Sequence, residues 1–266
     1  MPDLDLGSPE LAEVARVLAE AAGLSLSAGL RRTLRNGVEA AAASAGIEPL
    51  ELARRIVAGD RASLAVLVEH AVVLETYFYR HPQQLALLGR LLFDAPGPLA
   101  IWSAGCASGE EPYSVAMALL EAGRAGRGDR IVATDVSERA LATARAATYG
   151  PWALRRVPPR VAERWLAGPP ASRSVAGEAR ALVELRRHNL VADPAPGGPF
   201  DAILCRNVLI YFEPPVAAEV LYRLTDALRP GGLLVVGPVE LPLASALPLE
   251  WVDDQGGTVL RRRVEH

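Results

Sequence analysis

The sequence predicts an α/β fold in which a doubly wound, mostly parallel sheet is joined to a small N-terminal all-helical domain and carries a small inserted β subdomain. Strand-length apolar runs alternate with helical patterns from residue 99 onward, and apolar residues at helical spacing occupy residues 9–70. A stretch rich in Pro, Gly and Arg at about 151–187 interrupts the alternation and predicts the insertion. We therefore expect a helical domain at 1–77, a linker at 78–98 and an α/β domain at 99–266.

The N-terminal helices are indicated by apolar residues spaced three or four positions apart, which place these side chains on one helix face. Glycines interrupt the pattern at Gly23, Gly46 and Gly59, which divides the region into several short helices. The apolar positions include Leu11, Val14, Val17 and Leu18, and later Leu50, Ala53, Ile56 and Val57.

The α/β region contains strand and helix patterns in alternation, as in a doubly wound sheet. A turn-rich stretch from Asp94 to Pro98 leads into it. The expected elements are a strand at 99–106, a helix at 110–122, a strand at 130–136, a helix at 137–147, a strand at 200–206, and a helix end, turn and strand within 228–239.

The most informative segment is the glycine turn after the first strand. Gly105 and Gly109 allow a tight turn and a close approach of the backbone to a ligand. Because Glu110 and Glu111 would repel phosphates at the following helix start, a cationic, phosphate-free nucleoside such as S-adenosylmethionine is favoured. The alternative is that Ser108 and Glu111 form only a capping box on an ordinary helix.

Polar residues at the ends of two further strands extend this candidate site. Asp135 ends the second strand, where nucleotide-binding folds place the carboxylate that accepts the ribose hydroxyls. Asp135 could also merely cap the helix that begins near Ser137. A cap alone does not explain why a glycine turn after one strand is combined with a carboxylate at the end of the next. Asn207 follows the strand at 200–206, so Asn207 and Tyr211 are expected at the same sheet edge.

Composition limits the possible classes of function. Half of the 266 residues are apolar, and the formal net charge is −3. A slightly negative net charge does not suggest a nucleic-acid-binding surface. No apolar run approaches the ~20 residues of a membrane span, and no signal peptide is evident, so we expect a cytoplasmic protein without membrane insertion. Cys106 and Cys205 are the two cysteines, and we expect buried free thiols and no metal.

Several motifs closely resemble the CheR family of chemotaxis receptor methyltransferases, over most of the chain after residue 70. Two of them, Trp-Ser-Ala-Gly-Cys-x-x-Gly-Glu-Glu-Pro-Tyr-Ser and Cys-Arg-Asn-Val-x-Ile-Tyr-Phe, are specific to that family. The matching segments are Glu75 to Arg80, Ile101 to Met117, Ala133 to Val136, Phe200 to Phe212 and Leu228 to Glu240.

The resemblance implies a Rossmann-like, S-adenosylmethionine-dependent methyltransferase. Its activity would be methylation of glutamate side chains on the cytoplasmic helices of methyl-accepting chemotaxis receptors, giving methyl esters for sensory adaptation and S-adenosylhomocysteine as product. Arg80 and Tyr211 would face the incoming glutamate as catalytic residues. The implied cofactor shell is Thr76, Arg80, Gly105, Glu111, Asp135, Asn189, Leu190, Asn207 and Val208. In that shell, the resemblance places Asp135 at the ribose, Asn189 and Leu190 at the adenine, and Asn207 and Val208 at the methionine part.

The sequence departs from the family in three places. Leu74 stands where the family usually has Asn, and Pro238 and Val239 replace a His-Ser pair. The insertion is short compared with relatives that bind a receptor's C-terminal pentapeptide, so we expect no such tethering. The last residues, Val264 to His266, could be native or could be the start of a histidine tag. In the second case, the chain would be a fragment of a longer protein, and further C-terminal domains, which some relatives have, would be open.

Two other functions remain open from the sequence. A degenerate CheR-like module could bind S-adenosylmethionine or S-adenosylhomocysteine as a regulatory scaffold, and Leu74 favours this alternative. Methylation of a small molecule is the other, although an N-terminal helical domain suits a macromolecular partner better. Methylation of nucleic-acid adenine is disfavoured because no Asn/Asp-Pro-Pro-Tyr motif follows the strand at 200–206.

Overall fold

The N-terminal domain is a bundle of four helices within the described residues, as the helical spacing predicted. The computed structural model describes residues 9–24, 28–72 and 74–264, with the backbone alone for 28–31, so Glu265 and His266 of the expected tag lie outside it. Leu11, Val14 and Leu18 are buried with residues of the other helices in one apolar core. The helices are α1 (Pro9–Ala22), α2 (Ala28–Ala45), α3 (Pro49–Val57) and α4 (Arg61–Ala71).

A large, mostly parallel sheet forms the centre of the second domain, which confirms the predicted α/β fold class. Its seven strands, counted over the described part of the chain, run in the order β6-β2-β1-β7-β8-β10-β9. The first five are parallel, and β10 pairs antiparallel with β8 and β9. The strands are β1 (Ala100–Ala104), β2 (Arg130–Asp135), β6 (Val183–Arg187), β7 (Phe200–Cys205), β8 (Leu228–Val236), β9 (Leu249–Asp254) and β10 (Gly257–Arg262).

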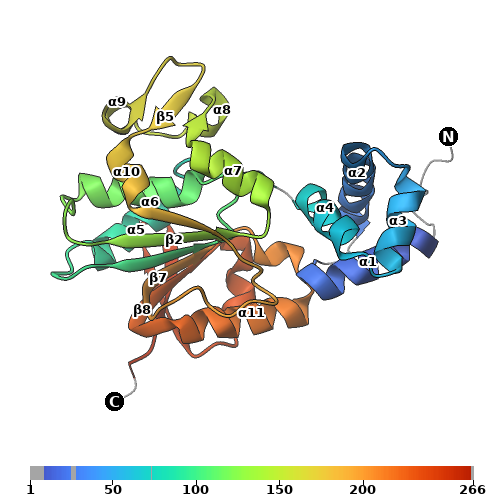
Figure 1. The fold of residues 1–266 in the computed structure, drawn as a ribbon. Coiled ribbons are helices and arrows are strands. Elements are labelled where there is room, and N and C mark those ends of the chain that lie inside the picture. The colour runs from blue at the N-terminus through green and yellow to red at the C-terminus, as the bar shows by residue number, and fades with distance from the viewer. Residues whose placement is uncertain (1–8, 25–27, 73, 265–266) are drawn as a thin grey trace.

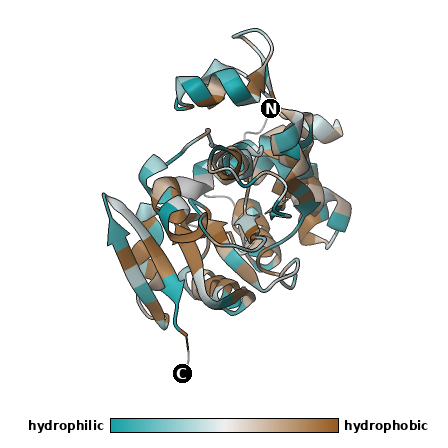
Figure 2. Cartoon of the chain, turned by 90° about the vertical axis from the view of Figure 1, so that its left-hand side faces the viewer, coloured by the Kyte–Doolittle hydropathy of each residue, from teal (hydrophilic) through white to brown (hydrophobic). Residues whose placement is uncertain are grey.

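Helices cover both faces of the sheet because the central strands are apolar on both sides. Ile101 faces the core under α5 and α6, whereas its neighbour Trp102 faces the core under α11. Figure 2 shows the hydrophobic residues, in brown, gathered on the strands. The covering elements are α5 (Pro82–Leu92), α6 (Glu110–Glu121), α7 (Glu138–Ala146), α11 (Pro214–Ala227) and the short 3-10 helices η1 (Leu209–Tyr211) and η2 (Pro238–Ala244).

A small three-stranded sheet interrupts the alternation between α7 and β6 (Figure 1). Part of the segment where we expected the insertion, Val183–Arg187, is β6 and pairs with β2 in the large sheet. No helix of the described chain is long and apolar enough to cross a membrane. The elements of this region are β3 (Thr148–Tyr149), α8 (Pro151–Leu154), α9 (Pro159–Trp165), β4 (Leu166–Ala167), β5 (Arg173–Val175) and α10 (Gly177–Ala181).

A buried ion pair fixes the connection between α5 and β1. Arg124 donates from Nε and Nη2 to the Asp129 carboxylate, each at 2.7 Å, and neither side chain is more than 1% exposed. The same guanidinium donates to the backbone carbonyls of Phe93, Ala95 and Gly97. The hydrogen bonds to backbone carbonyls offset part of the desolvation cost of burying the two charges. They also hold the chain in place just before the first strand.

Replacing Arg124 with Ala is expected to lower the free energy of unfolding by about 3–5 kcal/mol, because it leaves the buried Asp129 carboxylate without its partner. Urea denaturation followed by circular dichroism measures this change. The matched control is Arg127→Ala, which removes an exposed side chain that donates to the carbonyl of Ala95 at 3.2 Å. It should change the stability by less than about 0.5 kcal/mol. Equal effects of the two substitutions would contradict the role assigned to Arg124.

Candidate functional site

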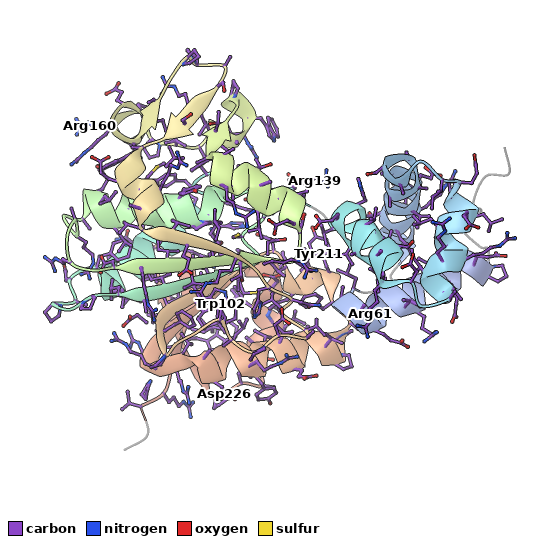
Figure 3. All side chains as sticks on the ribbon, in the orientation of Figure 1. Arg61, Trp102, Arg139, Arg160, Tyr211 and Asp226 are labelled. Carbon is purple, nitrogen blue, oxygen red and sulfur yellow. The ribbon has the colours of Figure 1, made fainter. Side chains whose placement is uncertain are left out.

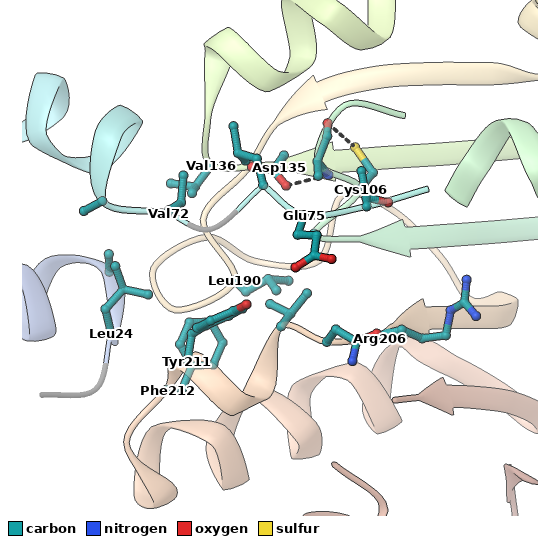
Figure 4. A pocket seen from close by; sticks show the side chains of 18 of the residues that line it. Leu24, Val72, Glu75, Cys106, Asp135, Val136, Leu190, Arg206, Tyr211 and Phe212 are labelled. Atoms are coloured by element: carbon teal, nitrogen blue, oxygen red, sulfur yellow. Dashed lines mark hydrogen bonds between the residues drawn. The ribbon is translucent and has the colours of Figure 1, made fainter. Parts of the chain in front are cut away.

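A pocket lies at the carboxyl ends of β1, β2 and β7, between the sheet and the helical domain. In Figure 4, Asp135 and Cys106 lie on one side of the pocket and Tyr211 and Phe212 on the other. Leu24 and Val72 of the helical domain form its end. All of the sequence-predicted site residues line this pocket: Thr76, Arg80, Gly105, Glu111, Asp135, Asn189, Leu190, Asn207, Val208 and Tyr211.

The glycine turn after β1 forms the floor of the pocket. Gly105 has φ +80°, and a Cβ atom there would lie 2.5 Å from Cγ2 of Val208. Its N–H and that of Cys106 both donate to the carbonyl of Thr134, at 2.8 and 2.9 Å, which ties the turn to β2. A side chain at position 105 is therefore excluded both by backbone conformation and by space.

The acidic helix start does not form the capping box that the sequence left open. Gly109 is the N-cap of α6, with no side-chain cap, and Ser108 donates instead to Glu110 at 2.7 Å. Glu111 accepts from Ser103 Oγ and from Arg206 Nε, both at 2.6 Å. The Glu111 carboxylate is thus held within the pocket wall rather than used to cap its own helix.

Asp135 joins the glycine turn to the start of α7. Oδ2 accepts from the N–H of Ala107 at 2.8 Å, and Oδ1 accepts from the N–H of Ser137 at 2.9 Å. The helix cap itself is Ser137, whose hydroxyl accepts from Ala140. Burial raises the pKa of Asp135 despite these two donors, which lower it. Each oxygen keeps a lone pair for a ligand hydroxyl.

The turn after β7 is held by a buried glutamate that the sequence interpretation did not assign to the site. Glu240 is fully buried, and its Oε2 accepts from the N–H groups of Gly237 and Asn207 at 2.7 and 2.8 Å. Oε1 accepts from Ile210. Asn207 has φ +59°, and its Oδ1 is buried without a hydrogen-bond partner among the described residues. Glu240 therefore holds Asn207 in a left-handed conformation beside the pocket.

Arg80 and Tyr211 line the same pocket and lie close enough to interact electrostatically. Arg80 donates to the carbonyl of Glu75 at 2.9 Å and faces the Tyr77 ring, with Cζ 5.7 Å from its centroid. Burial raises the pKa of Tyr211, an effect that the nearby Arg80 partly opposes. The phenol therefore keeps its proton at neutral pH and can donate a hydrogen bond.

The helical domain closes the pocket through contacts with loops of the α/β domain. Asn189 donates from Nδ2 to the carbonyl of Ala21 at 2.9 Å, while its Oδ1 accepts from Val191. Leu24 forms a backbone bridge with Phe212. The side chain of Asn189 thus holds its loop against α1.

Arg206, Glu75 and Cys106 also line the pocket and were not among the predicted site residues. Arg206 pairs with Glu111, and its signal in the sequence was a charge directly after the apolar run Ala202 to Cys205. Glu75 lines the pocket from the segment before Arg80. Cys106 is buried, and burial raises its thiol pKa; both cysteines are free, as expected.

Comparison with protein families identifies most of the α/β domain. The family described as CheR methyltransferase, SAM binding domain, matches residues 74–245. This range begins at the pocket-lining Leu74 and includes the glycine turn, Asp135 and the turn at Asn207.

Curated relatives agree with this match. The chain is 35% identical over 78% of its length to the probable biofilm formation methyltransferase WspC of Pseudomonas aeruginosa, of which it spans 51%. It is 41% identical to chemotaxis protein methyltransferase 2 of the same organism, covering 62% of each chain. The chemotaxis protein methyltransferase of Vibrio parahaemolyticus is 32% identical, with 90% of this chain and 92% of that protein covered. The chain thus spans about half to two thirds of the first two relatives and nearly all of the third.

Solved structures give more distant similarities. N-methyltransferase NodS from Bradyrhizobium japonicum, crystallised with S-adenosyl-l-homocysteine, overlays with a TM-score of 0.42 and 16% identity, covering 68% of this chain and 86% of that one. The family match and the relatives are sufficient on their own: the chain belongs to the CheR family of methyltransferases, and residues 74–245 form its S-adenosylmethionine-binding domain.

Proposed function

We propose that this methyltransferase esterifies glutamate side chains on the cytoplasmic helices of methyl-accepting chemotaxis receptors, in the cytoplasm, as part of sensory adaptation. The observation that carries the proposal is the convergence of Arg80 and Tyr211 with Asp135 and Asn207 in one pocket. Relatives named as chemotaxis protein methyltransferases support the receptor as acceptor. We also propose that it binds its receptor without tethering to a C-terminal pentapeptide.

The pocket residues fit S-adenosylmethionine. Asp135 offers carboxylate oxygens to ribose hydroxyls, and the unpartnered Oδ1 of Asn207 can accept a hydrogen bond from the ammonium of the methionine part. The absence of a side chain at Gly105 lets Val208 pack directly against the glycine turn, and both residues line the pocket. We therefore assign Asp135, Asn207, Gly105 and Val208 to the cofactor shell, with Thr76, Arg80, Glu111, Asn189 and Leu190 around them.

Methylation of a carboxylate requires positioning more than proton transfer. A glutamate with an ordinary pKa of about 4.3 is already an anion at neutral pH, and S-adenosylmethionine supplies an electrophilic methyl group with a neutral thioether as leaving group. The task of the protein is to hold the carboxylate oxygen in line with the sulfur-methyl bond and partly desolvated.

Arg80 and Tyr211 can perform this positioning. The Arg80 guanidinium would anchor the acceptor carboxylate by a charge-assisted hydrogen bond, and the neutral Tyr211 phenol would donate a second bond that fixes its orientation. Cys106 lines the same pocket, but burial raises its thiol pKa, so the reactive thiolate that could capture the methyl group is suppressed.

A degenerate module that binds the cofactor without transferring methyl is the second candidate. It is favoured by Leu74, which lines the pocket with an apolar side chain where the family usually has Asn. Retention of Arg80 and Tyr211 at the pocket supports the enzyme instead.

The proposed activity is tested by incubating the chain with radiolabelled S-adenosylmethionine and the purified cytoplasmic fragment of a methyl-accepting chemotaxis receptor. We expect label on the receptor that is released as methanol in base, as glutamyl methyl esters are. The relative WspC is named as a probable biofilm formation methyltransferase. A receptor fragment from a biofilm-forming signalling system is therefore tested in the same assay. Saturable cofactor binding with no labelled receptor of either class would support the regulatory module and contradict the proposal.

Asp135→Ala is expected to weaken S-adenosylmethionine binding at least about tenfold, because bonds to a charged acceptor contribute about 1.5–3 kcal/mol each. Isothermal titration calorimetry measures this, with the exposed Asp253→Asn as the control. Since burial raises the Asp135 pKa and ribose donors favour the ionised form, wild-type affinity should fall as pH decreases through that raised pKa. This loss should be absent in Asp135→Asn, and an identical pH profile in the two proteins would refute the assignment.

Arg80→Ala should reduce kcat/KM for the receptor about 10- to 100-fold, the value of a charge-assisted bond to the acceptor carboxylate. Tyr211→Phe, which removes only the hydroxyl, should reduce it about three- to tenfold. Initial rates at varied receptor concentration give both values. Arg90→Ala, at a partly exposed residue of α5 paired with Asp254, should retain wild-type kinetics. Unchanged methyl transfer by Arg80→Ala would rule out this role for Arg80.

A further inference from the structure

Arg155 lies between two aromatic rings just outside the pocket. Its guanidinium carbon is 3.8 Å from the centroid of the Tyr77 ring and 4.0 Å from that of Trp152. Arg155 follows directly after α8, and its Nη1 also donates to the carbonyl of Trp152. Contacts this close to two rings restrict the guanidinium to a narrow range of orientations.

The Arg155 stack is continuous with the acceptor side of the pocket. Tyr77 lines the pocket and faces Arg80 as well as Arg155. The N–H of Phe78 donates to the carbonyl of Ala153 at 3.0 Å, which fixes α8 against the segment that carries Arg80. Cations and rings therefore alternate outward from the pocket in the order Arg80, Tyr77, Arg155, Trp152; we call these four residues the cation-aromatic ladder.

The outer end of the cation-aromatic ladder is exposed and positively charged. Trp152 is 70% exposed, and Arg155 and Arg156 are exposed as well. Neither arginine has a carboxylate partner within the described residues. Residues 139–162 include five arginines and no Asp or Glu. This surface lies next to the pocket and combines unpaired guanidinium groups with an exposed aromatic ring. It is therefore complementary to an acidic surface patch on a protein acceptor.

We infer that Arg155 is a specificity-determining residue that binds a second carboxylate of the acceptor helix, one next to the glutamate held at Arg80. The inference rests on the proposed glutamate methylation. Stacking between Tyr77 and Trp152 orients the guanidinium before binding, which lowers the entropy lost when it forms hydrogen bonds. Arg155 acts on binding of the acceptor and touches neither the cofactor nor the reacting oxygen.

The test compares Arg155→Ala with Arg160→Ala in the full chain. Arg160 is an exposed arginine of α9, at the opposite end of the small subdomain from α8 (Figures 1 and 3). Kinetics are measured with the purified receptor cytoplasmic fragment and with a variant in which the acidic residues flanking the mapped methylation site are replaced by Gln. Arg155→Lys, which keeps the charge but not the planar stack, serves as the conservative variant.

Arg155→Ala should raise KM for the receptor fragment about three- to tenfold, with kcat and the affinity for S-adenosylmethionine unchanged. Arg155→Lys should recover part of the loss, and Arg160→Ala should match the wild type. With the Gln-flanked fragment, wild type and Arg155→Ala should have the same KM, a convergence that a purely structural role of Arg155 would not produce.

Two outcomes overturn the inference in distinguishable ways. If the wild type forms methyl esters and Arg155→Ala has the KM of Arg160→Ala, or the difference persists on the Gln-flanked fragment, the second carboxylate site is wrong while the proposed function stands. If the wild type forms no methyl ester on the receptor, the proposed function itself fails and the inference fails with it.

Discussion

The ion pair between Glu111 and Arg206 is the interaction on which the pocket wall depends. The two side chains are only 11% and 6% exposed and lie 2.6 Å apart. Glu111 also accepts from Ser103 of β1, and Arg206 donates to the carbonyl of Arg80 at 2.5 Å. One pair thus joins β1, the first turn of α6, the end of β7 and the segment that carries the proposed catalytic arginine. Removing one partner from such a pair costs about 3–5 kcal/mol, because the other charge stays desolvated.

The helical domain completes this wall and is held by polar contacts as well as apolar packing. Glu69 of α4 accepts from the N–H of Glu138 at 2.7 Å and from the Ser137 hydroxyl, so that a carboxylate of one domain lies at the positive end of α7 in the other. Arg139, labelled in Figure 3, donates to the Glu69 carbonyl. Asp135 immediately precedes this junction. Displacement of the helical domain would therefore change both the apolar end of the pocket and the surroundings of Asp135.

The strands that position the site could be predicted from the sequence because each is a short, buried, largely apolar run followed by a turn or ending in a polar residue. β6 was missed because the short, charged segment Val183–Arg187 lies at the end of the Pro-, Gly- and Arg-rich stretch that was assigned to the insertion, and its parallel pairing with β2 identifies it. Local spacing also suggested a capping box at Ser108 and Glu111, but the distant Arg206 competes for the Glu111 carboxylate. Glu240 was missed for the same reason: its role depends on backbone groups of Asn207 and Ile210, about thirty positions earlier in the chain.

The central claim is that this pocket holds the methyl donor with its reactive end toward Arg80 and Tyr211. A crystal structure of the chain with S-adenosylhomocysteine tests it most directly. The account predicts both ribose hydroxyls on the Asp135 carboxylate, the amino group of the methionine part near Asn207 Oδ1, and the sulfur facing Arg80 and Tyr211. A nucleoside bound elsewhere, or one whose sulfur faces away from Arg80, would contradict it.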